Sequence, residues 1–146
     1  MNSKKVSELL GVSTDTLRYY ERIGVIPPVE RDHNGYRVYK TNDLNWIYLA
    51  KSLRSAGLSI ESLIEFATLA RKGGKVRAAQ KDILHEQLDT LNTKLAQMKE
   101  TQALLQYKID MFDEHLAKFD SGQMTKDHTE ELWKKPFLKD KNKGEQ

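Results

Sequence analysis

Residues 14–39 decide the fold, and they read TDTLRYYERIGVIPPVERDHNGYRVY. Ser13, directly before this stretch, is a favourable helix N-cap because its hydroxyl can accept a hydrogen bond from a free backbone N–H. Gly24 suits the left-handed C-terminal stop of a helix, and Pro27 and Pro28 prevent the helix from resuming. The sequence therefore predicts a short helix that begins after Ser13 and ends near Gly24.

A tight hairpin is expected after this helix. The dipeptide Asn34-Gly35 is the strongest short-range hairpin signal, because both residues tolerate positive φ. Arg37 and Tyr39 then alternate along the strand YRVY, residues 36–39. A helix followed by a hairpin that carries Arg and Tyr is the outline of a winged helix-turn-helix.

The residues before this helix complete the motif. In SKKVSELLGV, residues 3–12, Val6, Leu9 and Leu10 lie on one helical face, and Gly11 occupies the turn between two helices. Leu17 is spaced to pack back onto that face. A helix-turn-helix shape alone is common, but the added hairpin and a second pair of helices favour DNA binding. The residues left outside, which are the candidate DNA contacts of the helix, are Thr14, Thr16, Arg18 and Tyr19.

Two further helices are expected, at about residues 41–56 and 59–72. Thr41 and Ser59 are suitable N-caps, and Gly57 and Gly73-Gly74 end the two helices. Apolar residues at helical spacing predict one buried face on each helix: Trp46, Leu49, Ala50 and Leu53 on the first, and Ile60, Leu63, Ile64 and Ala67 on the second.

The third organised region is a long helix with a heptad pattern. Alternating steps of four and three residues give Leu84, Leu88, Leu91, Leu95, Met98, Gln102, Leu105, Ile109, Phe112, Leu116 and Phe119. These eleven residues are called the seam below. All except Gln102 are apolar, which is the pattern of a two-stranded coiled coil and predicts a homodimer. A helix folded only against its own domain would need a wider apolar stripe. Gln102 lies near the middle of the seam, where it would meet its copy in either a parallel or an antiparallel pair.

Three segments of the chain resemble the DNA-binding domain of the MerR family of bacterial transcription regulators. They are VSELLGVSTDTLRYYERIGVIPP (residues 6–28), RDHNGYRVY (residues 31–39) and LRSAGLSIESL (residues 53–63). The combination of RYYE, a Gly and a Pro, and then NGYR is specific to this family. With the long helix that follows, the resemblance covers roughly four fifths of the chain.

The resemblance implies a mainly α fold in which a winged helix-turn-helix with a small β-hairpin precedes one long coiled-coil helix. It implies an antiparallel coil and a dimer on double-stranded promoter DNA, between two elements that RNA polymerase must engage together. The corner near residue 57 would act as a second wing. Arg37, Tyr39 and Arg54 are then expected to hold the phosphate backbone, with Lys51 a weaker candidate. The protein would act by bending and untwisting the promoter.

The segments SIESLIEF and YKIDMFDEHL resemble the subgroup of aldehyde- and stress-responsive members. Many members of that subgroup carry a cysteine near the second wing, whereas this chain has Ser52 at the matching position and no cysteine at all. A hydroxyl cannot replace a thiolate as a trap for electrophiles. A small-molecule inducer, if the protein has one, is therefore expected to bind noncovalently.

Composition agrees with this interpretation. Of 146 residues, 31% are charged, and the longest apolar run is five residues, which predicts no membrane span and a cytoplasmic location. The net charge is +3, with +4 in residues 1–76 and −1 in residues 77–146, so the basic half coincides with the expected DNA-binding half. The absence of cysteine excludes disulfides and thiolate metal sites. The four histidines are scattered, and no cofactor, metal or enzyme motif is found.

The expected domains are residues 1–72 for DNA binding, 76–119 for dimerisation and 120–146 for a short C-terminal segment. The last segment is expected to hold a short helix around residues 127–135 and an apolar patch of Leu132, Trp133, Phe137 and Leu138, followed by a disordered tail from Lys139. The patch could help to sense an inducer or merely cover the end of the coil. Two other functions remain open from sequence: a DNA-binding accessory protein of the phage excision or packaging type, and a coiled-coil interaction module.

Overall fold

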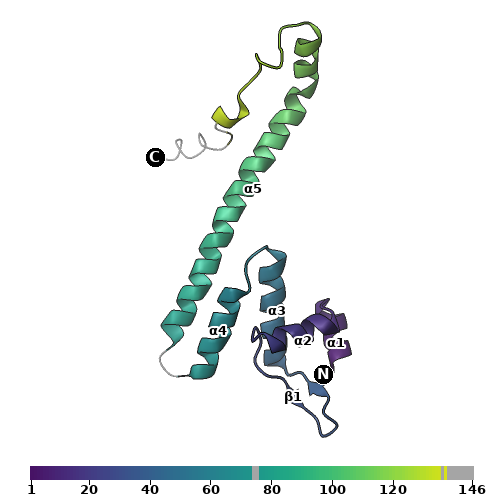
Figure 1. Ribbon diagram of the computed structural model, residues 1–146, viewed down its shortest axis with the longest axis vertical. Helices are drawn as coiled ribbons and strands as arrows, with labels where there is room; N and C mark the ends of the chain where they lie inside the picture. The colour runs from purple at the N-terminus through teal and green to yellow at the C-terminus, as the bar shows by residue number, and fades with distance from the viewer. Residues whose placement is uncertain (74–75, 136, 138–146) are drawn as a thin grey trace. The chain divides into compact units, whose positions relative to one another are not determined.

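The computed structural model describes residues 1–73, 76–135 and 137. It is mainly helical with one two-stranded hairpin, which confirms the fold class expected from the sequence (Figure 1). The chain forms two compact units, residues 1–91 and residues 92–146. The elements are α1 Ser3–Leu10, α2 Thr14–Arg22, β1 Glu30–Arg31, β2 Arg37–Val38, α3 Thr41–Ser55, α4 Glu61–Lys72, α5 Arg77–Asp120 and a 3₁₀ turn Leu132–Lys134.

The helix-turn-helix forms where its caps predict it. The Oγ of Ser13 accepts a hydrogen bond from the N–H of Thr16 at 3.1 Å, so Ser13 is the N-cap of α2. Gly11 ends α1 in the left-handed region with φ 65°, and Gly24 follows α2 with φ 82°. The predicted helix ends are therefore confirmed.

The hairpin is confirmed, and its turn is built mainly by Asp32. The strands pair antiparallel with Glu30 opposite Val38, and the N–H of Asp32 donates to the carbonyl of Tyr36 at 2.9 Å. The Asp32 carboxylate also accepts the N–H groups of Asn34 and Tyr36 at 2.9 and 3.0 Å. Gly35 has φ 84°, which gives the three-residue hairpin loop in which a turn is followed by a left-handed glycine.

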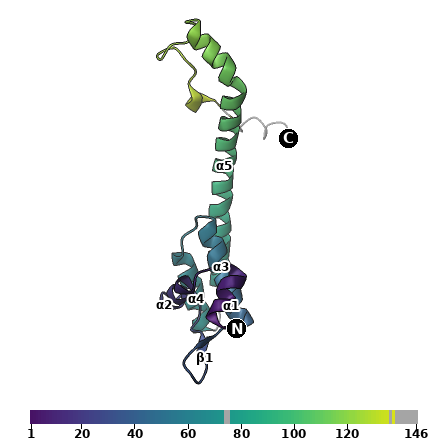
Figure 2. The same ribbon diagram turned by 90° about the vertical axis from the view of Figure 1, so that its right-hand side faces the viewer.

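One core joins the two halves of the helix-turn-helix to the base of the hairpin and to α3 and α4. The fully buried side chains include Val6, Leu17, Ile26 and Ile47. Leu9, which was expected on the buried face of α1, is exposed; Val6 and Leu10 make the contact instead. Figure 2 shows the hairpin projecting from the group formed by α1 to α4.

The second pair of helices begins differently from the prediction. Lys40, not Thr41, is the N-cap of α3, and its N–H is satisfied by the Asp43 carboxylate at 2.8 Å. Ile60, not Ser59, is the N-cap of α4, without a side-chain cap. The helices end as expected before Gly57 and Gly73, and Gly74 lies outside the described residues. The rings of Trp46 and Phe66 are 5.3 Å apart, which confirms Trp46 as a packing residue.

The first turns of α5 belong to the N-terminal unit and contact α4. Ile83 is buried, and the side-chain amide of Gln87 donates to the hydroxyl of Ser62 at 3.0 Å. The seam residues Leu84 and Leu88 are exposed beside this contact. In these first turns of α5, the face that packs against α4 is thus different from the face that carries the seam.

In the C-terminal unit, the chain after Asp120 folds back along the last turns of α5. We call residues 121–135 and 137 the C-terminal segment. The helix predicted around residues 127–135 is shortened to the single 3₁₀ turn, and an isolated bridge joins Thr125 to His128. Phe137 packs against Tyr107 with ring centroids 5.6 Å apart, whereas Trp133 is exposed. Leu138 and the predicted tail lie outside the described residues.

Candidate nucleic-acid interface

The outward face of α2 carries a shallow groove with a basic rim. The groove has a volume of about 470 Å³, and its lining residues are Asp15, Thr16, Arg18, Tyr19 and Arg22. Arg18 and Tyr19 are exposed, as the sequence predicted, while Thr14 and Thr16 are half-buried. The structure therefore places all four predicted residues of α2 on one short helix, with Arg18 and Tyr19 the most accessible.

Arg18 is free to leave its present partner. Its Nη1 lies 3.4 Å from the Asp15 carboxylate, and both side chains are more than half exposed. An exposed pair of this kind contributes little to stability, so a phosphate or a guanine edge can replace the carboxylate at small cost. Thr16 is less available, because its hydroxyl accepts a hydrogen bond from Ser13 at 2.8 Å.

Arg22 was not among the DNA contacts expected from the sequence. Its guanidinium lies 5.4 Å from the centre of the Tyr19 ring, in cation–π range, and it lines the same groove. The spacing could have indicated it, since residues 18 and 22 are one helical turn apart on the same face.

Tyr39 does not belong to the interface, and that prediction is wrong. Its side chain is 3% exposed and lies in the core, and its hydroxyl has no hydrogen-bond partner among the described residues. Its backbone is fixed as well, because its N–H donates to the carbonyl of Met1 at 2.8 Å and its carbonyl accepts from the N-terminal amine at 3.0 Å. Positions 37 and 39 share a face of the strand, and that face turns inward.

The accessible aromatic residue of the wing is Tyr36. It is 70% exposed and lies directly after the turn. Arg31, on the opposite strand, donates from Nη1 to the carbonyl of Gly35 at 2.9 Å, which holds the loop that carries Tyr36. Side chains alternate between the two faces of a strand, so residue 36 points to the opposite side from residues 37 and 39. The same alternation could therefore have identified Tyr36 as the exposed residue.

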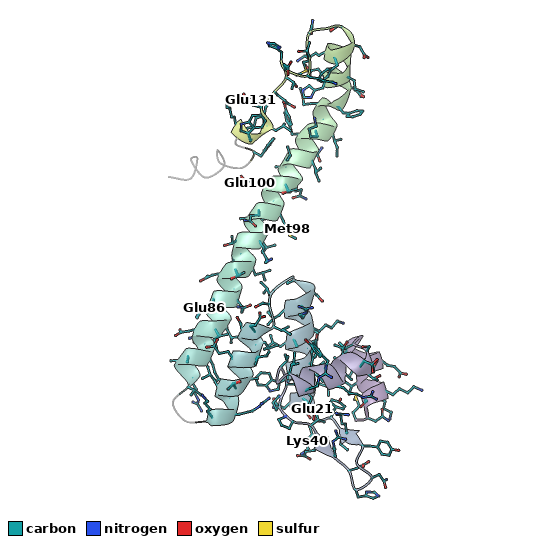
Figure 3. The ribbon with its side chains drawn as sticks, viewed as in Figure 1. Glu21, Lys40, Glu86, Met98, Glu100 and Glu131 are labelled. Carbon is teal, nitrogen blue, oxygen red and sulfur yellow. The ribbon has the colours of Figure 1, made fainter. Side chains whose placement is uncertain are left out.

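Arg37 joins the wing to α2. Its Nε donates to Oε2 of Glu21 at 2.7 Å, and both side chains are mostly buried. Glu21 is labelled in Figure 3, where it lies with Lys40 in the region between α2 and the hairpin. Lys40 in turn pairs with Glu30 at 2.6 Å, and this hydrogen bond raises the pKa of Lys40.

The two basic residues of α3 have different roles. Arg54 is exposed in the last turn of α3, beside the corner that leads to α4. Lys51 donates from Nζ to the carbonyl of Leu10 at 2.5 Å and so satisfies the end of α1. Lys51 therefore has a structural role, which makes it the less available of the two for a phosphate contact. Burial raises the pKa of Tyr20, whose side chain packs in the core, while the nearby charge of Arg54 opposes that shift.

The seam forms a second candidate surface. All of its residues except Leu91, which is half-buried, are exposed in the single chain. Met98, labelled in Figure 3, is 68% exposed. The exposed members are Leu84, Leu88, Leu95, Met98, Gln102, Leu105, Ile109, Phe112, Leu116 and Phe119.

Within residues 1–73, 76–135 and 137, no three His, Asp or Glu side chains are grouped to hold a metal ion. Among the helices described, none has the length and apolar character needed to cross a membrane.

Comparison with known proteins agrees with this geometry. Residues 1–68 match the model of the MerR HTH family regulatory protein. The HTH-type transcriptional regulator AdhR of Bacillus subtilis is 46% identical over 91 residues, which are 62% of this chain and 65% of that protein. The chain thus spans slightly less than two thirds of that relative.

Two solved structures are similar in fold. A MerR family transcriptional regulator from Listeria monocytogenes matches with a TM-score of 0.74 and 40% identity, over 85% of this chain and 99% of that one. HiNmlR, a MerR family regulator lacking the sensor domain and bound to promoter DNA, matches with a TM-score of 0.70 and 28% identity, over 80% and 92% of the two chains. The chain belongs to the MerR family of helix-turn-helix regulators, which are DNA-binding transcription regulators and not enzymes.

Proposed function

We propose that this protein binds a pseudo-palindromic promoter site as a homodimer and controls transcription by distorting the DNA. The observation that carries the proposal is the exposed seam on a chain whose N-terminal unit has its own filled core. Full burial of one large apolar side chain contributes about 1.5–3 kcal/mol, so a seam of this length favours a partner helix strongly.

An antiparallel pair of α5 helices fits the spacing of the seam. If Gln102 meets its copy, Leu105 lies opposite Met98 of the second copy, and Phe119 lies opposite Leu84. Every apolar seam residue then faces another apolar residue. The orientation itself is proposed from membership of the family, because the heptad pattern alone is compatible with a parallel pair.

For DNA recognition, we propose that α2 enters the major groove with Arg18 and Tyr19 foremost and with Thr14 and Thr16 near the groove. An arginine can bond a guanine edge with two hydrogen bonds and so carry sequence information. Arg22 extends the same basic face. The wing contributes Tyr36 and the terminal nitrogens of Arg37, and Arg54 contributes a phosphate contact at the second wing.

Control of transcription would follow from the shape of the bound DNA. Bending a promoter smoothly costs on the order of 1–6 kcal/mol, which backbone contacts at the two wings must offset. We propose that the distortion realigns two promoter elements for RNA polymerase. An inducer would bias this equilibrium by binding one state more tightly.

The C-terminal unit offers a place for a noncovalent inducer. A cavity of about 420 Å³ lies between α5 and the C-terminal segment, and its apolar lining includes Leu104, Leu132, Trp133 and Phe137. Pockets for small ligands have volumes of this size and a mostly apolar lining. This supports the sensing role of the segment over the alternative that it only covers the end of the coil.

The decisive experiment combines footprinting with transcription in vitro on the promoter of the protein's own gene region. Protection of two symmetric half-sites, with hypersensitive central bases and altered transcription, is the expected result. Protection without central hypersensitivity and with reduced transcription would leave repression by occlusion. Binding without any effect on transcription would instead favour a DNA-binding accessory protein.

A further inference from the structure

The contact between Glu21 and Arg37 is unlike the other ion pairs of the N-terminal unit. The Nε of Arg37 lies 2.7 Å from Oε2 of Glu21, and the two side chains are only 20% and 17% exposed. The other ion pairs described in residues 1–73 have side chains that are all more than half exposed. A charge pair that is withdrawn from water holds its geometry more firmly than an exposed one.

The wing depends on such contacts for its orientation. Its two strands form only two residue pairs, and a two-stranded hairpin of this size is marginally stable by itself. Val29 and Tyr39 are buried and fix its base in the core. Beyond the base, the side chain of Arg37 reaches across to the last turn of α2, which is the helix that carries Arg18 and Tyr19.

The charge of Glu21 is otherwise unfavourable at this place. A carboxylate on a helix that meets phosphates repels them, and each unit charge matters most where water is excluded. Arg37 neutralises that charge at hydrogen-bond distance. The Glu21 carboxylate itself offers no attraction to DNA, so any favourable contribution that it makes to binding must come from geometry.

We infer that Glu21 and Arg37 are positioning residues that fix the wing relative to α2, so that both elements meet the same duplex without further ordering. Ordering a loop during binding costs affinity, and a preformed arrangement avoids that cost. The inference rests on the proposed DNA-binding function. It adds a second task to the phosphate contact proposed for Arg37, because Nε of Arg37 holds Glu21.

A purely electrostatic role and a positioning role of Glu21 predict opposite changes in DNA affinity for Glu21→Gln. Removal of a negative charge should tighten binding to any duplex if only electrostatics matters. If Glu21 positions the wing, the variant should bind the duplex that the wild-type protein selects from a random pool about fivefold more weakly. Its affinity for a random duplex should be unchanged or higher.

Two further variants separate the effect of the charge at position 21 from the effect of side-chain length and pairing. Glu21→Asp keeps the charge but shortens the side chain by one methylene, and it should also weaken binding to the selected duplex. The double exchange Glu21→Arg with Arg37→Glu should recover part of the affinity that each single exchange loses. Glu8→Gln removes one exposed carboxylate from α1, away from the wing, and serves as the matched control with no loss of the selected duplex.

Affinities are measured by fluorescence anisotropy on the full chain at several salt concentrations, and thermal unfolding checks that each variant is folded. A weaker selected duplex for Glu21→Gln and Glu21→Asp, with partial recovery in the double exchange, supports the inference. Tighter binding of both duplexes by Glu21→Gln, or no change for Glu21→Asp, overturns it. Failure of the wild-type protein to select any duplex would refute the proposed function instead.

Discussion

The ammonium group of Lys135 lies 2.6 Å from the hydroxyl oxygen of Tyr107, so the C-terminal segment is tied to α5 by a hydrogen bond between residues 28 positions apart. The same hydroxyl donates to the carboxylate of Glu130, and that carboxylate also lies 3.5 Å from Nδ1 of His115. Lys135 lies over the Tyr107 ring as well, 4.4 Å from its centre. This group of four side chains determines where the C-terminal segment docks.

Tyr107→Phe should loosen the C-terminal segment. The variant keeps the ring that packs against Phe137 but removes the hydroxyl that serves both Glu130 and Lys135. Loss of hydrogen bonds to charged groups costs about 1.5–3 kcal/mol each. Amide hydrogen exchange in residues 125–135 should accelerate by at least about tenfold, since 1.4 kcal/mol is one decade. Tyr36→Phe, in the wing, is the control and should leave these amides unchanged.

Acid should release the same segment. Desolvation raises the pKa of Glu130, but the hydrogen bonds from Tyr107 and Lys135 and the nearby positive charge lower it more, so the net shift is below the ordinary value of 4.5. Its stabilising effect is fully present above that value and is lost as the pH falls through the lowered pKa. Hydrogen exchange or NMR between pH 7 and pH 3 should show this loss, and Glu130→Gln should abolish the pH dependence of docking.

Arg18→Ala should weaken binding to the selected duplex by more than about tenfold, because a charge-assisted hydrogen bond contributes roughly 1.5–3 kcal/mol. The exposed Arg18 side chain pairs with the exposed Asp15 in the free protein, so its removal leaves the fold intact. Anisotropy titrations measure the loss. An affinity equal to that of the wild-type protein would remove Arg18 from the interface.

Arg54→Ala should weaken selected and random duplexes alike and reduce the slope of log affinity against log salt by about one. The reason is that a phosphate contact releases a counterion but reads no base. Lys51→Ala is the contrasting variant: it loses the hydrogen bond to Leu10 and should lower thermal stability without changing the salt slope. A loss confined to the selected duplex would contradict the role given to Arg54.

Leu95→Glu combined with Leu105→Glu should convert the dimer to monomers, because both positions lie on the exposed apolar seam. Sedimentation measures the mass, and the affinity for the selected duplex should fall with it, since one half-site is held weakly. Ala96→Glu combined with Gln97→Glu adds the same charge at exposed positions beside the seam and should leave the dimer intact. A full-size dimer of the Leu95 and Leu105 variant would show that the heptad interpretation is wrong.

The sequence by itself determined the elements and the outward face of α2. Ser13 capped that helix, Gly11 and Gly24 ended the two helices of the motif, and residues 34–35 marked the hairpin, as their types predicted. The exposure of Arg18 also followed from helical spacing. Caps, turns and periodicity act over a few residues, so their physics is contained in a short stretch of sequence.

Tertiary structure decided which side chains of the wing are exposed and which basic side chains already have a partner within the protein. Alternation placed Arg37 and Tyr39 together, but only packing showed that their face turns inward, towards Glu21 and the core. Lys51 could not be assigned from sequence either, because its partner Leu10 is 41 residues away. Such contacts depend on how separate elements pack, and a polar side chain takes whatever partner the packing brings within reach.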